Sequence, residues 1–157
     1  MLTIIRDYNL EDVKRELKRM LEEGSQLPEV RQLALQITSK IPYDGDQISA
    51  IYDFVKANIK YQPDPYDKEL FIHPRRMIKF YEQGIGAGDC DDLALFTTSL
   101  LRSLGYQSNV VLLDTKGEGL DHAVCEVLIN EVHLTIDPSS EYPLGWDEKF
   151  YQKNVVD

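Results

Sequence analysis

This 157-residue sequence lacks the features that mark several large protein classes. No apolar run approaches the roughly 20 residues that span a bilayer, and the N-terminus has no basic segment followed by a long apolar stretch. We therefore expect a cytoplasmic protein without a membrane span. The sequence also contains no glycine-rich phosphate loop and no dinucleotide fingerprint, so it implies no nucleotide cofactor.

Basic residues are scarce relative to acidic ones. Seventeen Lys and Arg against 27 Asp and Glu give a formal charge of −10, which repels nucleic-acid phosphates and anionic lipid surfaces. The one basic cluster, Arg75, Arg76 and Lys79, is too small to reverse this. The sequence thus predicts neither a nucleic-acid nor a membrane partner, and calcium binding on the acidic surface stays open.

Cysteine occurs only twice, at Cys90 and Cys125. In a cytosolic chain these residues could form one disulfide, pack as core thiols or include a nucleophile. Their local sequence settings must distinguish these cases.

Hydrophobic spacing divides the chain into a helical half and a strand-rich half. Helical periodicity predicts helices after Asn9, from Pro28 towards Ile41, and after the "DGD" at 44–46, then a short helix Pro74–Glu82 and one from Cys90 to Gly105. An irregular loop is expected over 60–74, where three prolines occur.

After Gly105 three short β-branched runs, "SNVVLLD", "HAVCEVLI" and "VHLTID", predict an antiparallel sheet, followed by a closing tail rich in aromatic residues. The expected class is α+β, with one central helix packed on a small sheet. We expect one domain over 1–157, its helical part about 1–105 and its sheet part about 106–157.

Cys90 stands where the central helix should begin, in "GAGDCDDLALF". Asp89 as N-cap and Asp92 at the third helical position would form a capping box. The positive end of a helix dipole stabilises a thiolate, whereas Asp89, Asp91 and Asp92 raise a thiol pKa. A buried structural cysteine is the competing interpretation.

His122 and Asp137 should lie on one face of the sheet. If Asn130 and Glu131 form a two-residue turn, residue 124 lies opposite 137, and Asp137 becomes a diagonal neighbour of His122. A nucleophile, an imidazole and an orienting carboxylate form the set used by cysteine hydrolases and acyltransferases.

Other arrangements of the same residues remain open. Cys90, His122 and Asp137 could instead hold zinc, although no paired spacing supports a metal site. Strand alternation turns Cys125 away from His122, which favours a core thiol and disfavours a Cys90–Cys125 disulfide. His73, before a proline, is expected to be a surface or capping residue.

The blocks "GDCDDLALFTTSLLRSLGYQSNVV", "DHAVCEV" and "LTIDP" resemble the transglutaminase-like superfamily, and "FIHPRRMIKFYEQGIGAGDCDD" is similar to its phage-associated members. The resemblance covers roughly 59–139 and implies a papain-like fold with Cys90 as nucleophile, His122 as base and Asp137 as orienter. It also implies that Tyr61 lines the site, and a tyrosine that anchors the loop is the competing interpretation. The chain departs from the family pattern near the last strand, where His133 lies in place of a tryptophan.

The main hypothesis is therefore a cysteine hydrolase or acyltransferase that forms a thioester with a protein or peptide substrate and needs no cofactor. The alternative is a non-catalytic structural or assembly module that keeps the same fold. Such a module could be encoded by a phage. The acidic residues around Cys90 support this alternative.

Overall fold

The structure is a computed structural model that describes residues 2–5, 9–63 and 69–156. Five helices and eight short strands follow one another along these residues. In chain order they are β1 (Leu2–Ile5), α1 (Leu10–Ser25), α2 (Pro28–Ile37), α3 (Asp44–Asn58), β2 (Lys60–Tyr61), β3 (Glu69–Ile72), α4 (Pro74–Glu82), β4 (Ala87–Gly88), α5 (Cys90–Ser103), β5 (Gln107–Asp114), β6 (His122–Ile129), β7 (Val132–Ile136) and β8 (Gln152–Val156).

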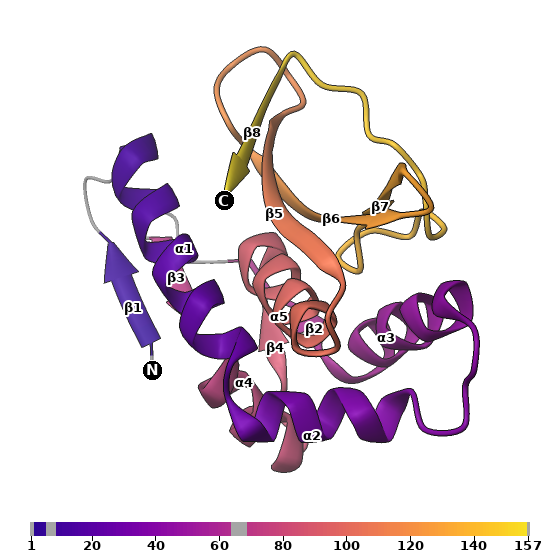
Figure 1. Ribbon diagram of the computed structural model, residues 1–157. Coiled ribbons are helices and arrows are strands. Elements are labelled where there is room, and N and C mark those ends of the chain that lie inside the picture. The colour runs from indigo at the N-terminus through magenta and orange to yellow at the C-terminus, as the bar shows by residue number, and fades with distance from the viewer. Residues whose placement is uncertain (1, 6–8, 64–68, 157) are drawn as a thin grey trace.

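Helix α5 is the centre of the molecule. Every residue from Asp92 to Leu101 is buried, because the four other helices contact α5 and the strands β5 and β6 also pack against it. Figure 1 shows α5 between the sheet and the remaining helices. Leu93 and Phe96 share one core cluster with Cys125 of β6, so the helical half and the sheet bury a common core. The predicted α+β class with a central helix on an antiparallel sheet is confirmed.

The four-stranded sheet has the order β7-β6-β5-β8, and all of its pairs are antiparallel. Asn130 and Glu131 form the β6–β7 turn with φ of 51° and 65°, the left-handed values that a tight hairpin needs. Cys125 lies opposite Ile136, so the register is the one expected from a two-residue turn. Glu131 adopts this conformation although it carries a side chain that disfavours it.

Three strand pairings were not predicted. β1 pairs with β3, β2 pairs with β4, and β8 pairs with β5. β2 and β3 occupy parts of the predicted loop over 60–74, whose residues 64–68 lie outside the described ranges, and β8 occupies the end of the predicted tail. These strands are short, and their partners are distant in sequence, so alternation alone does not reveal them. Helix α2 also ends earlier than expected, at Ile37, and Lys40 follows with a left-handed φ of 66°.

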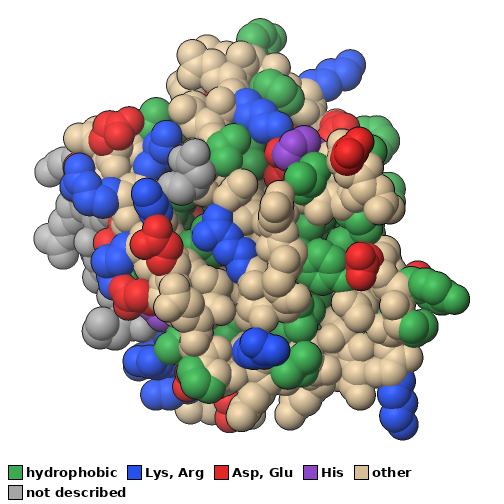
Figure 2. Space-filling model, viewed as in Figure 1, with side chains coloured by type: hydrophobic (Ala, Val, Ile, Leu, Met, Phe, Trp, Pro, Cys, Tyr) green, Lys and Arg blue, Asp and Glu red, His purple; other side chains and the backbone are tan. Residues whose placement is uncertain are grey.

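The surface that Figure 2 shows carries Lys and Arg side chains interspersed with Asp and Glu. Across the described ranges, none of the helices combines the length and the apolar character needed to cross a bilayer.

Close packing of α1 against α4 and α5 makes a specific prediction at Gly24. A Cβ at this position would lie 2.5 Å from Pro74 Cγ and 3.1 Å from Ser99 Oγ, so Gly24→Ala should lower the free energy of unfolding by about 1–3 kcal/mol through overpacking. Gly45, in α3, has nothing within 4 Å of its Cβ position, and Gly45→Ala should raise stability by about 0.5–1 kcal/mol. Urea denaturation of both variants checks this, and equal effects would contradict the packing.

Candidate functional site

Cys90 is the first residue of α5, and a capping box fixes its position. The Asp92 backbone N–H donates to Asp89 Oδ1 at 3.2 Å, and the Asp89 N–H donates to Asp92 Oδ2 at 3.1 Å. These bonds satisfy backbone donors that a helix start leaves without partners. The predicted cap is therefore confirmed, and it places the thiol at the positive end of the α5 dipole.

Asp92 also ties α5 to another element. Its second oxygen, Oδ1, accepts from the Ile72 N–H of β3 at 2.8 Å, and the residue is 1% exposed. Gly88 in β4 lies so close that a Cβ there would be 2.6 Å from Asp92 Cβ. The backbone before Cys90 is thus held by one buried carboxylate that spans β3, β4 and α5.

His122 begins β6 and is paired with Asp137, which follows β7. His122 Nε2 and Asp137 Oδ2 are 2.7 Å apart. The N–H and the hydroxyl of Ser139 both donate to Asp137 Oδ1, at 3.1 and 2.6 Å, so both carboxylate oxygens have partners. The predicted diagonal contact across the hairpin is confirmed.

The pairing determines how the imidazole is protonated. An ionised carboxylate only accepts hydrogen bonds, so Nε2 carries the proton shared with Asp137. Nδ1 is then the basic nitrogen of the neutral ring.

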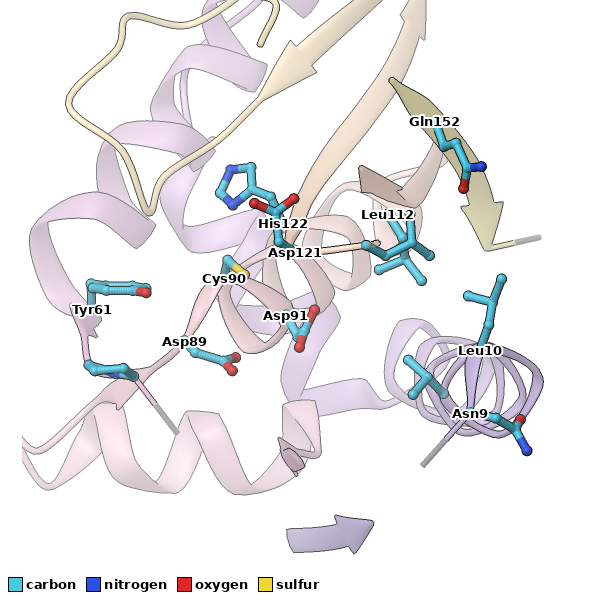
Figure 3. Close-up of a pocket in the computed structure, with 13 residues that line it drawn as sticks. Asn9, Leu10, Tyr61, Asp89, Cys90, Asp91, Leu112, Asp121, His122 and Gln152 are labelled. Atoms are coloured by element: carbon cyan, nitrogen blue, oxygen red, sulfur yellow. The ribbon is translucent and has the colours of Figure 1, made fainter. Parts of the chain in front are cut away.

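Cys90, His122 and Tyr61 line one cavity of about 550 Å³. Figure 3 shows Cys90 and His122 beside each other, with Tyr61 on one side of the sulfur and Leu10 and Leu112 on the other. The backbone N–H of Ala123, at the start of β6, also acts on the Cys90 thiol and favours its thiolate. The structure therefore brings three of the predicted residues to one cavity, and the fourth, Asp137, is bonded to His122.

Electrostatics shift both members of the His122–Asp137 pair. Burial lowers the pKa of His122, but the hydrogen bond and negative charge of Asp137 outweigh it, so the pKa is raised. Burial raises the pKa of Asp137, but the hydrogen bond and charge of His122, together with Ser139, lower it overall. Each partner therefore favours the charged form of the other.

The environment of Cys90 acts in the opposite direction. Burial raises the pKa of its thiol well above the usual value, the charges of Asp91 and Asp89 raise it further, and the Ala123 N–H partly offsets them. Burial thus acts in the same direction as the acidic neighbours, and the net shift is away from the thiolate. Cys90 thus rests as a thiol that needs a base for ionisation.

The remaining predicted positions fall where their patterns suggested, with one difference. Cys125 is fully buried and not disulfide-bonded, and burial raises its pKa to about 12. His73 caps α4 by accepting from the Arg75 N–H at 3.1 Å, but it is buried and not on the surface. His133 Nδ1 lies 3.1 Å from Glu126 Oε1, away from the cavity.

Among the residues that the structure describes, no three or more His, Cys, Asp or Glu side chains are grouped so that they could hold a metal ion. The zinc alternative for Cys90, His122 and Asp137 therefore gains no support from the geometry.

Sequence reasoning missed several contributors to the site. Ser139, in "DPSS", donates its backbone N–H to the Asp137 carboxylate two residues earlier, as in the Asx-turns that Asp commonly forms, so this signal was present in the sequence. Leu10 of α1 and Gln152 of β8 also line the cavity. They come from the two ends of the chain, and no local pattern indicates that they approach Cys90.

Comparisons with known proteins agree with this architecture. The family model of the transglutaminase-like superfamily matches residues 31–138. The chain belongs to this superfamily. A search of the curated proteins found no match.

Two solved structures share this fold at low sequence identity, and a third aligns less well. A proposed cysteine protease from Cytophaga hutchinsonii matches with a TM-score of 0.59 and 19% identity, over 88% of this chain and 49% of that one. A proposed protease from Parabacteroides distasonis matches with a TM-score of 0.61 and 14% identity, over 83% of this chain and 26% of that one. A TGase aligns with a TM-score of 0.49 and 16% identity over 92% of this chain and 36% of that one. The chain therefore spans about half or less of the length of these structures.

Substitution of Asp92 should lower the stability of the fold more than substitution of other polar residues. Asp92→Ala leaves the N–H groups of Ile72 and Asp89 without their acceptor, and each such buried donor costs about 1–3 kcal/mol. We expect the free energy of unfolding to fall by about 2–4 kcal/mol. Chemical denaturation measures this, with Asn9→Ala at the exposed cap of α1 as the matched control, where about 1 kcal/mol is expected. Equal losses would contradict the role given to Asp92.

The His122–Asp137 pair should make stability depend on pH. A raised His122 pKa stabilises the fold fully below about pH 6.5, and this contribution is lost as pH rises through the folded-state value. A lowered Asp137 pKa stabilises it above about pH 3.9, and this contribution is lost as pH falls through the folded-state value. Asp137→Asn should therefore destabilise most between about pH 4.5 and 6.

Thermal denaturation at pH 5.5 and 8.5 tests this dependence. The exposed substitution Asp53→Asn serves as the control for a lost carboxylate. A loss in Asp137→Asn that is the same at both pH values would show that the pair is not coupled as described.

Proposed function

We propose that this domain is a cysteine-dependent hydrolase or acyltransferase that acts on amide or peptide acyl groups through a thioester on Cys90. One observation carries the proposal: a thiol at a helix start shares a cavity with an imidazole whose Nε2 is bonded to Asp137. Nucleophile, base and orienter are the elements of covalent acyl transfer. Membership of the superfamily supports this chemistry.

In the first half of the reaction, His122 Nδ1 accepts the Cys90 thiol proton and the sulfur attacks the substrate carbonyl carbon. The new C–S bond places negative charge on the carbonyl oxygen. The C–N bond then breaks, and His122 returns the proton to the departing amine. Asp137 stabilises the imidazolium that forms in between, which agrees with the raised pKa of His122.

In the second half, water or an amine attacks the thioester, and His122 removes its proton. The C–S bond breaks, and the sulfur regains a proton from the imidazolium. Hydrolysis and acyl transfer use the same side chains, so peptide cleavage, deamidation and crosslinking are outcomes of one mechanism. The acyl donor, a peptide bond or a side-chain amide, distinguishes cleavage from deamidation, and the acceptor, water or an amine, distinguishes hydrolysis from crosslinking.

Donors for the carbonyl oxygen are available beside the sulfur. The backbone N–H of Cys90 lies in the first turn of α5, where no intrahelical acceptor exists for it. Tyr61 lines the same cavity, and we assign its phenol to the substrate wall. Both positions agree with a site that stabilises charge formed during the reaction.

A non-catalytic assembly module is the second candidate. The observation that favours it is the raised pKa of Cys90, which follows from burial and from Asp91 and Asp89. In that case the domain would use its surface for partners, and the thiol would be only a packed residue at a helix start.

Acylation of the protein by p-nitrophenyl acetate separates the two candidates. We expect intact-protein mass spectrometry to show an acetyl group on Cys90 in the native protein and in Cys125→Ser, but none in Cys90→Ser. His122→Ala should slow acylation by about 10²- to 10⁴-fold. Equal acylation of the native and His122→Ala proteins would support the non-catalytic module.

A further inference from the structure

Cys90 lies at the edge of a hydrophobic core that opens into the cavity. Leu112 of β5 belongs to a buried core cluster, and the partly buried residues Leu10, Leu120 and Cys90 pack against that cluster. All four residues also line the cavity. Figure 3 shows Leu10 and Leu112 on the side of Cys90 opposite to Tyr61. The core therefore presents an apolar surface to whatever binds next to the sulfur.

The carboxylates that line this cavity are engaged within the protein. Asp121 accepts from the N–H and the hydroxyl of Thr115, at 2.7 and 2.5 Å. Asp89 accepts from the Asp92 N–H at 3.2 Å, and Asp91 is engaged as well. A polar group that entered beside the leucines would leave its water partners and find the leucine side chains without any to offer. An apolar group gains free energy by leaving water at the same place.

A buried carboxylate holds the loop that carries Leu120. Asp114, at the end of β5, is 4% exposed, and its oxygens accept from the N–H groups of residues 116–119 at 2.7 to 3.3 Å. The Asp121 N–H closes the loop by donating to the Leu113 carbonyl at 2.9 Å. Leu120 is thus held in place before a substrate arrives, and a surface formed in advance costs little ordering on binding.

We infer that the surface formed by Leu10, Leu112 and Leu120 binds an aliphatic side chain of the acyl-donating peptide, next to the carbonyl that Cys90 attacks. The inference rests on the proposed function, because it takes the substrate carbonyl to lie at Cys90. It deepens that function by naming the class of substrate.

Continuity between the apolar surface and the sulfur assigns this surface to the acyl donor. Cys90 packs against the same core cluster as Leu10 and Leu120, so a group on these leucines lies next to the carbon that bonds to the sulfur. The cavity, of about 550 Å³, accommodates a side chain in addition to the reacting amide. The substrate class is therefore a peptide with an aliphatic residue at the carbonyl that forms the thioester.

Peptide binding to Cys90→Ala tests the inference without any turnover. The probes are two acetylated, amidated alanine pentapeptides with leucine or asparagine at the centre, two side chains of similar shape and different polarity. NMR titration should show the leucine peptide binding about 5- to 20-fold more tightly than the asparagine peptide. The methyl signals of Leu112 and Leu120 should shift on binding.

Truncation of the apolar surface provides the second arm. Leu120→Ala, made in the Cys90→Ala background, should bring the two peptide affinities to within about twofold, and Leu10→Ala should reduce the preference in the same direction. Leu35→Ala is the matched control, because Leu35 is 48% exposed on α2, and it should retain the full preference. Circular dichroism verifies that each variant is folded.

Esters that differ in chain length test whether the surface serves the acyl group. In p-nitrophenyl hexanoate and acetate the chain is attached directly to the reacting carbonyl, and the sulfur takes the acyl group as p-nitrophenolate leaves. We expect hexanoate to acylate Cys90 about 5-fold faster than acetate, after division by the same ratio for N-acetylcysteine. Leu120→Ala should lose this preference, and Leu35→Ala should keep it.

Equal affinity for the two peptides, no binding of either peptide, or a preference that survives Leu120→Ala would overturn the inference. An acylation ratio equal to that of N-acetylcysteine would also overturn it. Its failure is distinguishable from failure of the proposed function. A leucine preference in Cys90→Ala combined with no acylation of the native protein would remove catalysis and leave an aliphatic binding site. Acylation that depends on His122, combined with no preference, would do the reverse.

Discussion

The buried carboxylate of Asp92 is the constraint on which the rest of the site depends. It accepts from the N–H groups of Ile72 and Asp89 and completes the capping box at the start of α5. These bonds set where the central helix begins relative to β3 and β4. Because the helix start carries Cys90, the position of the sulfur follows from how this carboxylate is satisfied.

The same helix start creates an electrostatic conflict. The α5 dipole favours an anion at Cys90, whereas Asp89 and Asp91 oppose it. A protein that needed only a stable helix would gain from the acidic first turn without any penalty. A catalytic thiol in this setting depends on a base, the role that we propose for His122.

Much of the site was predictable from local sequence patterns. Asp89 and Asp92 have capping-box spacing around Cys90, and the Asn130–Glu131 turn fixes a register that brings His122 to Asp137. The short strands β1, β3 and β8 were not predictable, because each pairs with a partner far along the chain. The cavity was missed for the same reason: Leu10 and Gln152 approach Cys90 only after the whole chain has folded.

The pH dependence of iodoacetamide alkylation at Cys90 tests the central claim most directly. Mass spectrometry would follow the rate in the native protein, His122→Ala and Asp137→Asn, with the buried Cys125 as an internal reference. The account predicts that removing His122 moves the Cys90 profile to higher pH by about one unit or more, that Asp137→Asn moves it part of the way, and that Cys125 stays unmodified. Identical profiles in all three proteins would contradict the account.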